Sequence, residues 1–140
     1  MSAPGRSSAP SQIVIDASAL VELLLRTAVG GRVASLLGSA RMVAPDLINI
    51  ETLQAVRGLQ RAGKLSIERA AQAVARLAES PIARIPTGGL IAEVWSLRSN
   101  LSAYDASYVA LARALDCPLL TTDAPLRRAP ALGVAILTVG

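Results

Sequence analysis

The chain contains no histidine and only one cysteine among its 140 residues. Without histidine, Ser-His-Asp and Cys-His triads, His-ligated zinc and acid–base catalysis by an imidazole are excluded. Any chemistry must therefore use carboxylates, hydroxyls, arginine or a bound metal. The single Cys117 excludes an intramolecular disulfide, which favours a reducing, cytoplasmic compartment. Because it precedes Pro118 at an expected strand start, this residue is interpreted as a small buried hydrophobe.

Aromatic residues are also scarce, at 2% of the chain, whereas 52% of the residues are hydrophobic. The core must therefore be aliphatic, and the apolar excess favours a further buried surface such as an oligomer interface. No apolar run is long enough to span a membrane, because the run that begins at Ile13 is interrupted by Asp16 and Glu22, so a soluble protein is expected. Residues 1–11 are rich in Ser, Ala, Pro and Gly and are expected to form a disordered leader, which leaves residues 12–140 as a single domain.

Acidic residues are outnumbered, since 14 Lys and Arg against 10 Asp and Glu give a formal charge of +4. Lys64 is the only lysine, so almost all of the positive charge is carried by arginine. The planar guanidinium group suits phosphate recognition, and a polyanionic partner is one interpretation. A basic protein without such a partner is the other.

Short aliphatic runs alternate along the chain with patterns typical of helices. Strands are predicted at 13–15, 42–44, 82–85, 118–121 and 134–137. Helices are predicted at 19–25, 33–37, 46–62, 67–79, 90–99 and 103–115, with a short one after Pro125. Ser18 and Asp46 are expected to cap the first and third helices, and Gly30-Gly31 to break the chain between the first two. This alternation predicts parallel βαβ units in a three-layer α/β/α sandwich around a central parallel five-stranded sheet.

Two acidic residues directly follow predicted strands. Asp16 ends the buried run 13–15, and Asp123 follows the β-rich run 119–122. Ligands of open α/β sheets bind outside the carboxyl ends of the strands, so both residues are candidates for a functional site. For Asp123, which shortly precedes Pro125, a helix N-cap is an equally simple interpretation.

Glu51 lies on the helix predicted at 46–62. Its neighbours on the helix face are apolar: Leu47, Ile48, Ala55 and Leu59. A carboxylate in a stripe that faces the sheet costs desolvation unless it has a partner, which favours a functional role over a snorkelling or cap-bound Glu.

Asp105 lies in the first turn of the helix that Ser102 is expected to cap. Leu101, Val109 and Ala112 share its face, which again places a carboxylate among apolar residues. The alternative is a variant capping box of Ser102 and Asp105, in which the acid also favours the helix dipole.

Four acids from separate segments would therefore meet at one edge of the sheet. Clustered carboxylates repel one another unless a cation lies between them. Oxygen ligands without His or Cys suit a hard divalent ion, Mg²⁺ or Mn²⁺. With a basic chain outside, this pattern indicates metal-assisted hydrolysis of a phosphodiester.

Four stretches of the sequence resemble the motifs of PIN domains, and of VapC-type toxins in particular. Residues 13–20 (IVIDASAL) resemble the opening of the family, and residues 45–56 its second motif. Residues 104–112 (YDASYVALA) are the most specific match, and residues 119–123 (LLTTD) are similar to the fourth motif. The resemblance extends from about residue 13 to residue 140.

The resemblance implies a PIN-like fold and a Mg²⁺-dependent endoribonuclease toxin, a homodimer inhibited by a VapB-type antitoxin. Asp16 and Asp105 match the positions assigned as metal ligands. Glu51 and Asp123 match the other two acids of the catalytic quartet. By the same resemblance, the hydroxyls of Ser18 and Thr122 would orient carboxylates or water.

Basic residues could contact the RNA phosphates in such a protein: Arg57, Arg61, Lys64, Arg69 and Arg76. A solvated helix face explains them equally well. The few aromatic residues make an extended base-stacking platform improbable. The apolar helices between residues 19 and 37 are a candidate surface for the homodimer or the antitoxin.

Three other functions are compatible with parts of this pattern. A phosphoacceptor receiver domain also binds Mg²⁺ at strand ends, but it needs a lysine after the last strand, whereas Lys64 is in mid-chain. A non-catalytic PIN-like binding module is disfavoured because all four acidic positions are filled. A DNA-directed nuclease of the same fold stays open.

Overall fold

The computed structural model describes residues 9–127 and 132–139 and shows a single parallel sheet. Its strands are β1 (Gln12–Ile15), β2 (Arg41–Pro45), β3 (Ile82–Ile85), β4 (Leu119–Thr121) and β5 (Ile136–Thr138). They lie in the order β3-β2-β1-β4-β5, and every neighbouring pair is parallel. The predicted five-stranded parallel sheet is therefore confirmed, although the fifth strand begins two residues later than the sequence pattern indicates.

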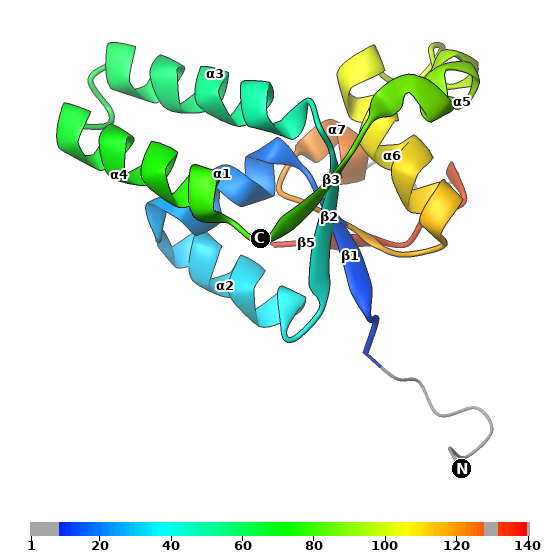
Figure 1. Ribbon diagram of the computed structural model, residues 1–140, viewed down its shortest axis with the longest axis horizontal. Helices are drawn as coiled ribbons and strands as arrows, with labels where there is room; N and C mark the ends of the chain where they lie inside the picture. Colours follow the sequence, from blue (N-terminus) through cyan, green and yellow to red (C-terminus); the bar gives the residue numbers. More distant parts are fainter. Residues whose placement is uncertain (1–8, 128–131, 140) are drawn as a thin grey trace.

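Helices cover both faces of this sheet. They are α1 (Ala17–Leu25), α2 (Ala28–Leu37), α3 (Ile48–Arg61), α4 (Ile67–Glu79), the 3₁₀ turn η1 (Thr87–Leu90), α5 (Ile91–Ser96), α6 (Ala103–Leu115) and α7 (Ala124–Arg127). The chain moves across the sheet in one direction from β1 to β3 and returns to β4 and β5, so right-handed crossovers place the two sets of helices on opposite faces. Figure 1 shows α1–α4 on one side of the strands and α5 and α6 on the other. The predicted α/β/α sandwich is confirmed.

β1 is the central strand, and its three aliphatic residues are completely buried. It pairs with β2 on one side and with β4 on the other, with Ile15 beside Leu120. The strand order reverses between β1 and β4, and such a switch point leaves a crevice outside the carboxyl ends of the two strands. Asp16 and Thr121 therefore reach the same edge of the sheet.

The link between α1 and α2 differs from the prediction. The chain turns at Arg26, whose φ of 55° is left-handed, and Thr27 then caps α2 by accepting from the Gly30 N–H. Gly30 and Gly31 lie inside α2 and do not break the chain between the two helices, contrary to the prediction. A Cβ at Gly30 would lie 2.1 Å from the carbonyl oxygen of Glu22, so this glycine allows α2 to approach the backbone of α1.

The start of α3 also differs from the prediction. The helix begins at Ile48, and its N-cap residue, Leu47, makes no side-chain cap. The Asp46 N–H donates to the carbonyl of Ile85, extending the backbone pairing of β2 with β3 and delaying the helix. The helices predicted at 67–79 and 103–115 are confirmed, with Ser66 and Ser102 as N-caps.

The helix predicted at 90–99 is shorter and begins earlier, as η1 followed by α5. The Ser96 hydroxyl donates to the Glu93 carbonyl at 2.6 Å, and such bonds compete with continuation of a helix. The predicted leader, residues 1–11, lies largely outside the described residues. Within residues 9–127 and 132–139, no helix is long and apolar enough to cross a membrane.

The prediction that the apolar helices between residues 19 and 37 form a surface for the homodimer or the antitoxin is wrong for most of this segment. Its large apolar side chains lie in the core: Leu20, Val21, Leu24, Leu25, Val33 and Leu37. They are buried because α1 packs against α2, α3 and α4. The exposed large apolar side chains are mostly on other helices: Leu36, Ile50, Leu53, Ile67, Val74, Ile91, Trp95 and Tyr104.

Candidate active site

Asp16 is the N-cap of α1 and is only 4% exposed. Its Oδ1 accepts hydrogen bonds from the Ala19 N–H at 3.0 Å and from the Ser18 hydroxyl at 2.7 Å. Its Oδ2 accepts from the Thr121 hydroxyl on β4. The predicted cap by Ser18 is therefore wrong, because the strand-end carboxylate itself caps the helix and Ser18 lies in the first turn, where it orients that carboxylate.

Two hydroxyls join the ends of β1 and β4. Thr121 Oγ1 accepts from the Asp123 N–H at 2.9 Å, and Ser18 Oγ accepts from the Thr122 N–H at 3.0 Å. The hydroxyl that reaches Asp16 belongs to Thr121, and Thr122 contributes its backbone N–H, so an orienting role of the Thr122 hydroxyl towards water stays a prediction. The signal for Thr121 is the parallel register, which puts the last residue of β4 next to Asp16.

Opposing effects act on the Asp16 carboxyl. Burial raises the pKa of Asp16, the hydrogen bonds from Thr121, Ala19 and Ser18 oppose that rise, and the negative charge of Asp123 adds to it. An ionised carboxylate offers about four lone-pair directions. The three hydrogen bonds leave one of these directions, on Oδ2, without a donor among the described residues.

Asp105 lies half-buried in the first turn of α6. Its N–H donates to the Ser102 hydroxyl at 3.1 Å, so Ser102 caps the helix through the Asp105 backbone and the carboxylate is not needed for that cap. Burial, followed by the charges of Asp123, Asp16 and Glu51, raises the pKa of Asp105 to about 6. All four predicted acids therefore lie close enough for their charges to act on one carboxyl group.

Glu51 differs from the prediction in its surroundings. Of the predicted stripe, Ile48 is buried and Leu47 and Leu59 pack partly buried against the core, whereas Ala55 is exposed. The fully buried residues of α3 form the i, i+4, i+8 row Ile48, Thr52 and Val56. Glu51 is half-buried on the flank of this row. The hydroxyl of Tyr108, which is 1% exposed, donates to Glu51 Oε1 at 2.6 Å. Tyr108 thus provides the partner that a carboxylate at this position requires, and the signal for it is its place one helical turn after Asp105.

The acidic side chains of the site offer carboxylate oxygens, the ligand type that suits a hard divalent ion. No group of three or more Asp, Glu, Cys or His side chains in residues 9–127 and 132–139 is arranged to hold a metal. Mg²⁺ is ordinarily held by one or two carboxylates together with water and substrate phosphates, so an enclosing cage is not required. The spare lone pair of Asp16 and the repulsion felt by Asp105 fit a hydrated hard cation at the site's edge.

Two of the predicted RNA-binding arginines donate hydrogen bonds to the backbone of α1, although Arg69 is itself exposed and Arg76 only partly buried. Arg69 donates to the carbonyl of Leu25 at 2.9 Å, and Arg76 donates to the carbonyl of Leu24 at 2.8 Å. Both bonds satisfy carbonyl groups at the C-terminal end of α1 and attach α4 to it. The other basic residues of this set are exposed on the α3–α4 hairpin: Arg57, Arg61 and Lys64.

Comparisons with known proteins agree with this fold. A family model for the PIN domain matches residues 13–132. The chain is 43% identical to the ribonuclease VapC9 of Mycobacterium tuberculosis over 114 residues, which cover 79% of this chain and 85% of that protein. It is 40% identical to the ribonuclease VapC3 of the same organism over 124 residues, or 88% and 90% of the two chains.

Solved structures share the fold at lower identity. The crystal structure of M. tuberculosis VapC20, a sarcin-ricin loop cleaving toxin, matches with a TM-score of 0.63 and 21% identity over 85% of this chain and 95% of that chain. VapBC2 from Rickettsia felis, bound to a DNA fragment from its promoter, matches with a TM-score of 0.63 and 13% identity over 90% and 97%. At these identities the likeness extends to the fold alone.

Proposed function

Because this chain belongs to the PIN-domain family and to its VapC group, we propose that it is a metal-dependent endoribonuclease toxin in a single domain, residues 12–140. The observation that carries the proposal is the convergence of four acids from separate segments, since the charges of Asp123, Asp16 and Glu51 all act on the half-buried carboxyl of Asp105. Carboxylates that share a site at a sheet's switch point need a cation, and Mg²⁺ or Mn²⁺ suits oxygen ligands.

Asp16 and Asp105 would hold the ion, and Glu51 and Asp123 complete the acidic quartet. When bound, the ion supplies an activated water and a Lewis acid for cleavage of an RNA phosphodiester. Asp16 is fixed by Ser18 and Thr121, so its free lone pair has a defined direction.

Each of the other carboxylates is positioned by a different neighbour. Tyr108 holds Glu51 through a 2.6 Å hydrogen bond, and the backbone of Asp123 is anchored on Thr121. Both groups would accept hydrogen bonds from water at the site. Asp105, with its pKa near 6, exchanges a proton close to neutral pH and can release it when a cation enters.

The proposal includes partners. A VapB-type antitoxin would inhibit the toxin in the cytoplasm, as the membership of this chain in the VapC group of toxins implies. A homodimer is proposed because large apolar side chains remain exposed on α3 and α4, namely Ile50, Leu53, Ile67 and Val74. Sedimentation of the protein alone and with a co-expressed antitoxin would measure both associations.

The test is cleavage of structured RNA and of total cellular RNA with Mg²⁺ or Mn²⁺, beside an EDTA control. Asp105→Asn is the better inactive variant, because the amide that Asp16→Asn introduces would face three donors in the core and could unfold the protein. Glu79→Gln, an exposed carboxylate on α4, is the matched control.

Metal-dependent cutting by the wild type and by Glu79→Gln, with loss in Asp105→Asn, is the expected result. Duplex and single-stranded DNA are tested in parallel, and cleavage of DNA alone would identify a DNA-directed nuclease instead. A protein that binds the metal but cuts none of these substrates would be a non-catalytic PIN-like binding module.

A further inference from the structure

An apolar groove of about 650 Å³ lies between α5 and the first turns of α6. Its lining includes Leu47, Ile91, Trp95, Arg98, Tyr104 and Ser107. Two of the three aromatic residues of the chain are here, and both are exposed: Trp95 is 66% exposed and Tyr104 is 63% exposed. Large aromatic side chains that stay this exposed in a hollow are typical of a binding surface.

The groove carries one positive charge and no negative one. The Arg98 guanidinium carbon lies 4.6 Å from the centre of the Trp95 ring, and Nη1 of Arg98 donates to the Trp95 carbonyl at 3.0 Å. These contacts hold the cation over the aromatic face. No carboxylate lines the groove, so a polyanionic backbone meets no repulsion within it.

The groove and the acidic site share the start of α3 and the first turns of α6. Tyr104 lies one helical turn before Tyr108 on α6, and Tyr108 holds Glu51. On the other wall, the carbonyl of Leu47 accepts from the Glu51 N–H at 3.0 Å. A molecule bound in the groove would therefore extend directly to the carboxylate site.

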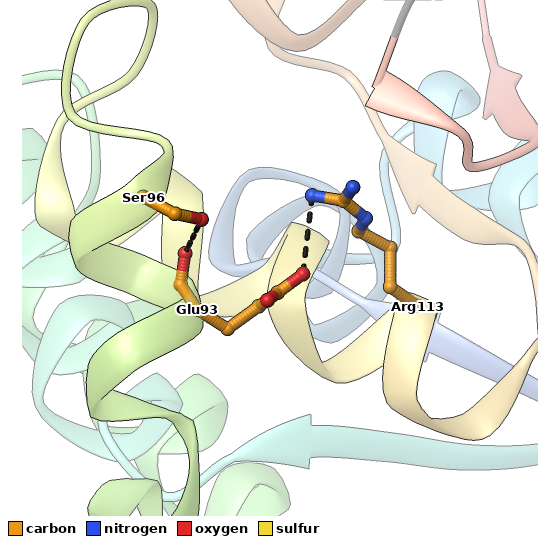
Figure 2. Close-up of polar contacts among 3 residues, drawn as sticks. All are labelled: Glu93, Ser96 and Arg113. Atoms are coloured by element: carbon orange, nitrogen blue, oxygen red, sulfur yellow. Dashed lines mark hydrogen bonds and ion pairs between the residues drawn. The ribbon is translucent and has the colours of Figure 1, made fainter.

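The two helical walls are held together independently of any ligand. Glu93 on α5 pairs with Arg113 on α6 at 3.2 Å, and Ser96 donates to the Glu93 carbonyl (Figure 2). The ion pair is exposed and contributes little free energy, so apolar packing is the main contact that holds α5 on α6. Leu90 and Leu97 bury the two ends of α5 in the core. The groove is therefore preformed, as small-ligand sites usually are.

We propose that this groove binds one unpaired nucleobase of the RNA next to the cleaved phosphodiester. Trp95 and Tyr104 provide the stacking surfaces, and Arg98 contacts the phosphate of the same nucleotide. Unstacked bases of single-stranded RNA are typically held on aromatic rings and arginine planes, and a groove of this volume suits a small ligand. The inference rests on the ribonuclease function proposed above and adds a site for a single base, since the chain has too few aromatic residues for an extended platform.

Trp95 is the only tryptophan of the chain, so its fluorescence reports on the groove directly. Single-stranded RNA oligonucleotides titrated into the wild-type protein in EDTA should quench this fluorescence to saturation. Tyr104→Leu should weaken the quenching titration. Ile67→Ala, which removes an equally exposed apolar side chain from α4, should not.

Binding of labelled RNA, measured by anisotropy, separates stacking from simple apolar contact. Trp95→Leu should lose roughly tenfold in affinity, within the range for one stacked base, whereas Trp95→Tyr should retain most of it. Arg98→Ala should lower the slope of log K against log salt by about 0.7, the value for one phosphate contact on a single strand.

Four results separate this proposal from its competitors. Equal RNA binding by the Trp95 leucine and tyrosine variants would overturn it, and the groove would then be an apolar docking surface for a protein. A change in sedimentation for Trp95→Leu, without a change in RNA affinity, would overturn it in favour of an interface between copies of this chain. RNA cleavage without Trp95 quenching would overturn the groove's role and leave the nuclease intact. Quenching without cleavage would support the groove and refute the ribonuclease.

Discussion

Replacing Asp105 by asparagine should stabilise the metal-free protein. Burial and the charges of the three other acids raise the pKa of Asp105 from 3.8 to about 6. The folded state therefore binds this proton more tightly than the unfolded state does. Below about pH 3.8 the carboxyl is protonated in both states and the repulsion is absent. As the pH rises to about 6 the folded state loses stability, and above that pH the cost is complete.

The magnitude follows from the size of the shift. Each pKa unit corresponds to about 1.36 kcal/mol of differential interaction between the two protonation states. Asp105 is half-buried, so screening by solvent reduces the effect considerably. We expect Asp105→Asn to raise the free energy of unfolding by about 1 kcal/mol at pH 8, a rise of about 3 °C in Tm for a domain of this size.

The assay is thermal unfolding at pH 8 and pH 4.5 in EDTA, repeated with Mg²⁺. The asparagine variant should gain stability at pH 8 and much less at pH 4.5, where Asp105 of the wild type is mostly protonated. Mg²⁺ should stabilise the wild type at pH 8 and have little effect on the variant, because the ion relieves a repulsion that the variant lacks. Glu79→Gln controls for the loss of a negative charge. An equal gain at both pH values, or none at pH 8, would refute the reasoning.

Three further predictions concern packing and the hydrogen bond to the site. Gly30→Ala should lower the free energy of unfolding in urea by about 3 kcal/mol, because its Cβ would lie 2.1 Å from a carbonyl oxygen of α1. Gly31→Ala, whose Cβ would have no atom within 4 Å, should raise it by up to about 1 kcal/mol. Equal effects of the two substitutions would contradict the close packing of α2 on α1. Tyr108→Phe should lower metal-dependent RNA cleavage about 10- to 100-fold with the fold retained, and unchanged activity would show that Glu51 needs no orienting partner. Thr52→Val should stabilise the protein by about 1 kcal/mol in the same unfolding assay, since within the described residues the buried Thr52 hydroxyl has no hydrogen-bond partner; a loss would reveal one.

The fold was largely predictable because its signals are local and redundant. Residues 13–15 are too apolar for an edge strand, and they occupy the centre of the sheet with no exposed surface. Helix boundaries were less predictable where tertiary contacts decide them. Gly30 does not break the chain as predicted, because its lack of a side chain instead allows α2 to approach α1 closely. Asp46 does not cap a helix as predicted, because its N–H pairs with the neighbouring strand β3.

The acids of the candidate site were predictable from their places after strands and on helix faces, whereas their partners were not. Thr121 reaches Asp16 only through the register of β1 with β4, which pairs residues more than a hundred positions apart in the chain. Tyr108 lies on α6 and Glu51 lies on α3, so their hydrogen bond joins helices that cover opposite faces of the sheet (Figure 1). Such contacts depend on side-chain directions in the folded chain, whereas strand register and helix spacing indicate only which residues lie nearby.

The first turn of α6 connects the two proposed binding events. It carries Asp105, which faces the other acids, and Tyr104, which lines the groove, at adjacent positions of one helix that Ser102 caps. Adjacent helical residues point about 100° apart, so one helix presents a cation ligand to one side and a stacking surface to the other. A base held on Tyr104 would therefore set where its phosphate meets the ion. The distance between base and cleaved bond would be fixed by the helix itself, independently of the exposed arginines on the α3–α4 hairpin.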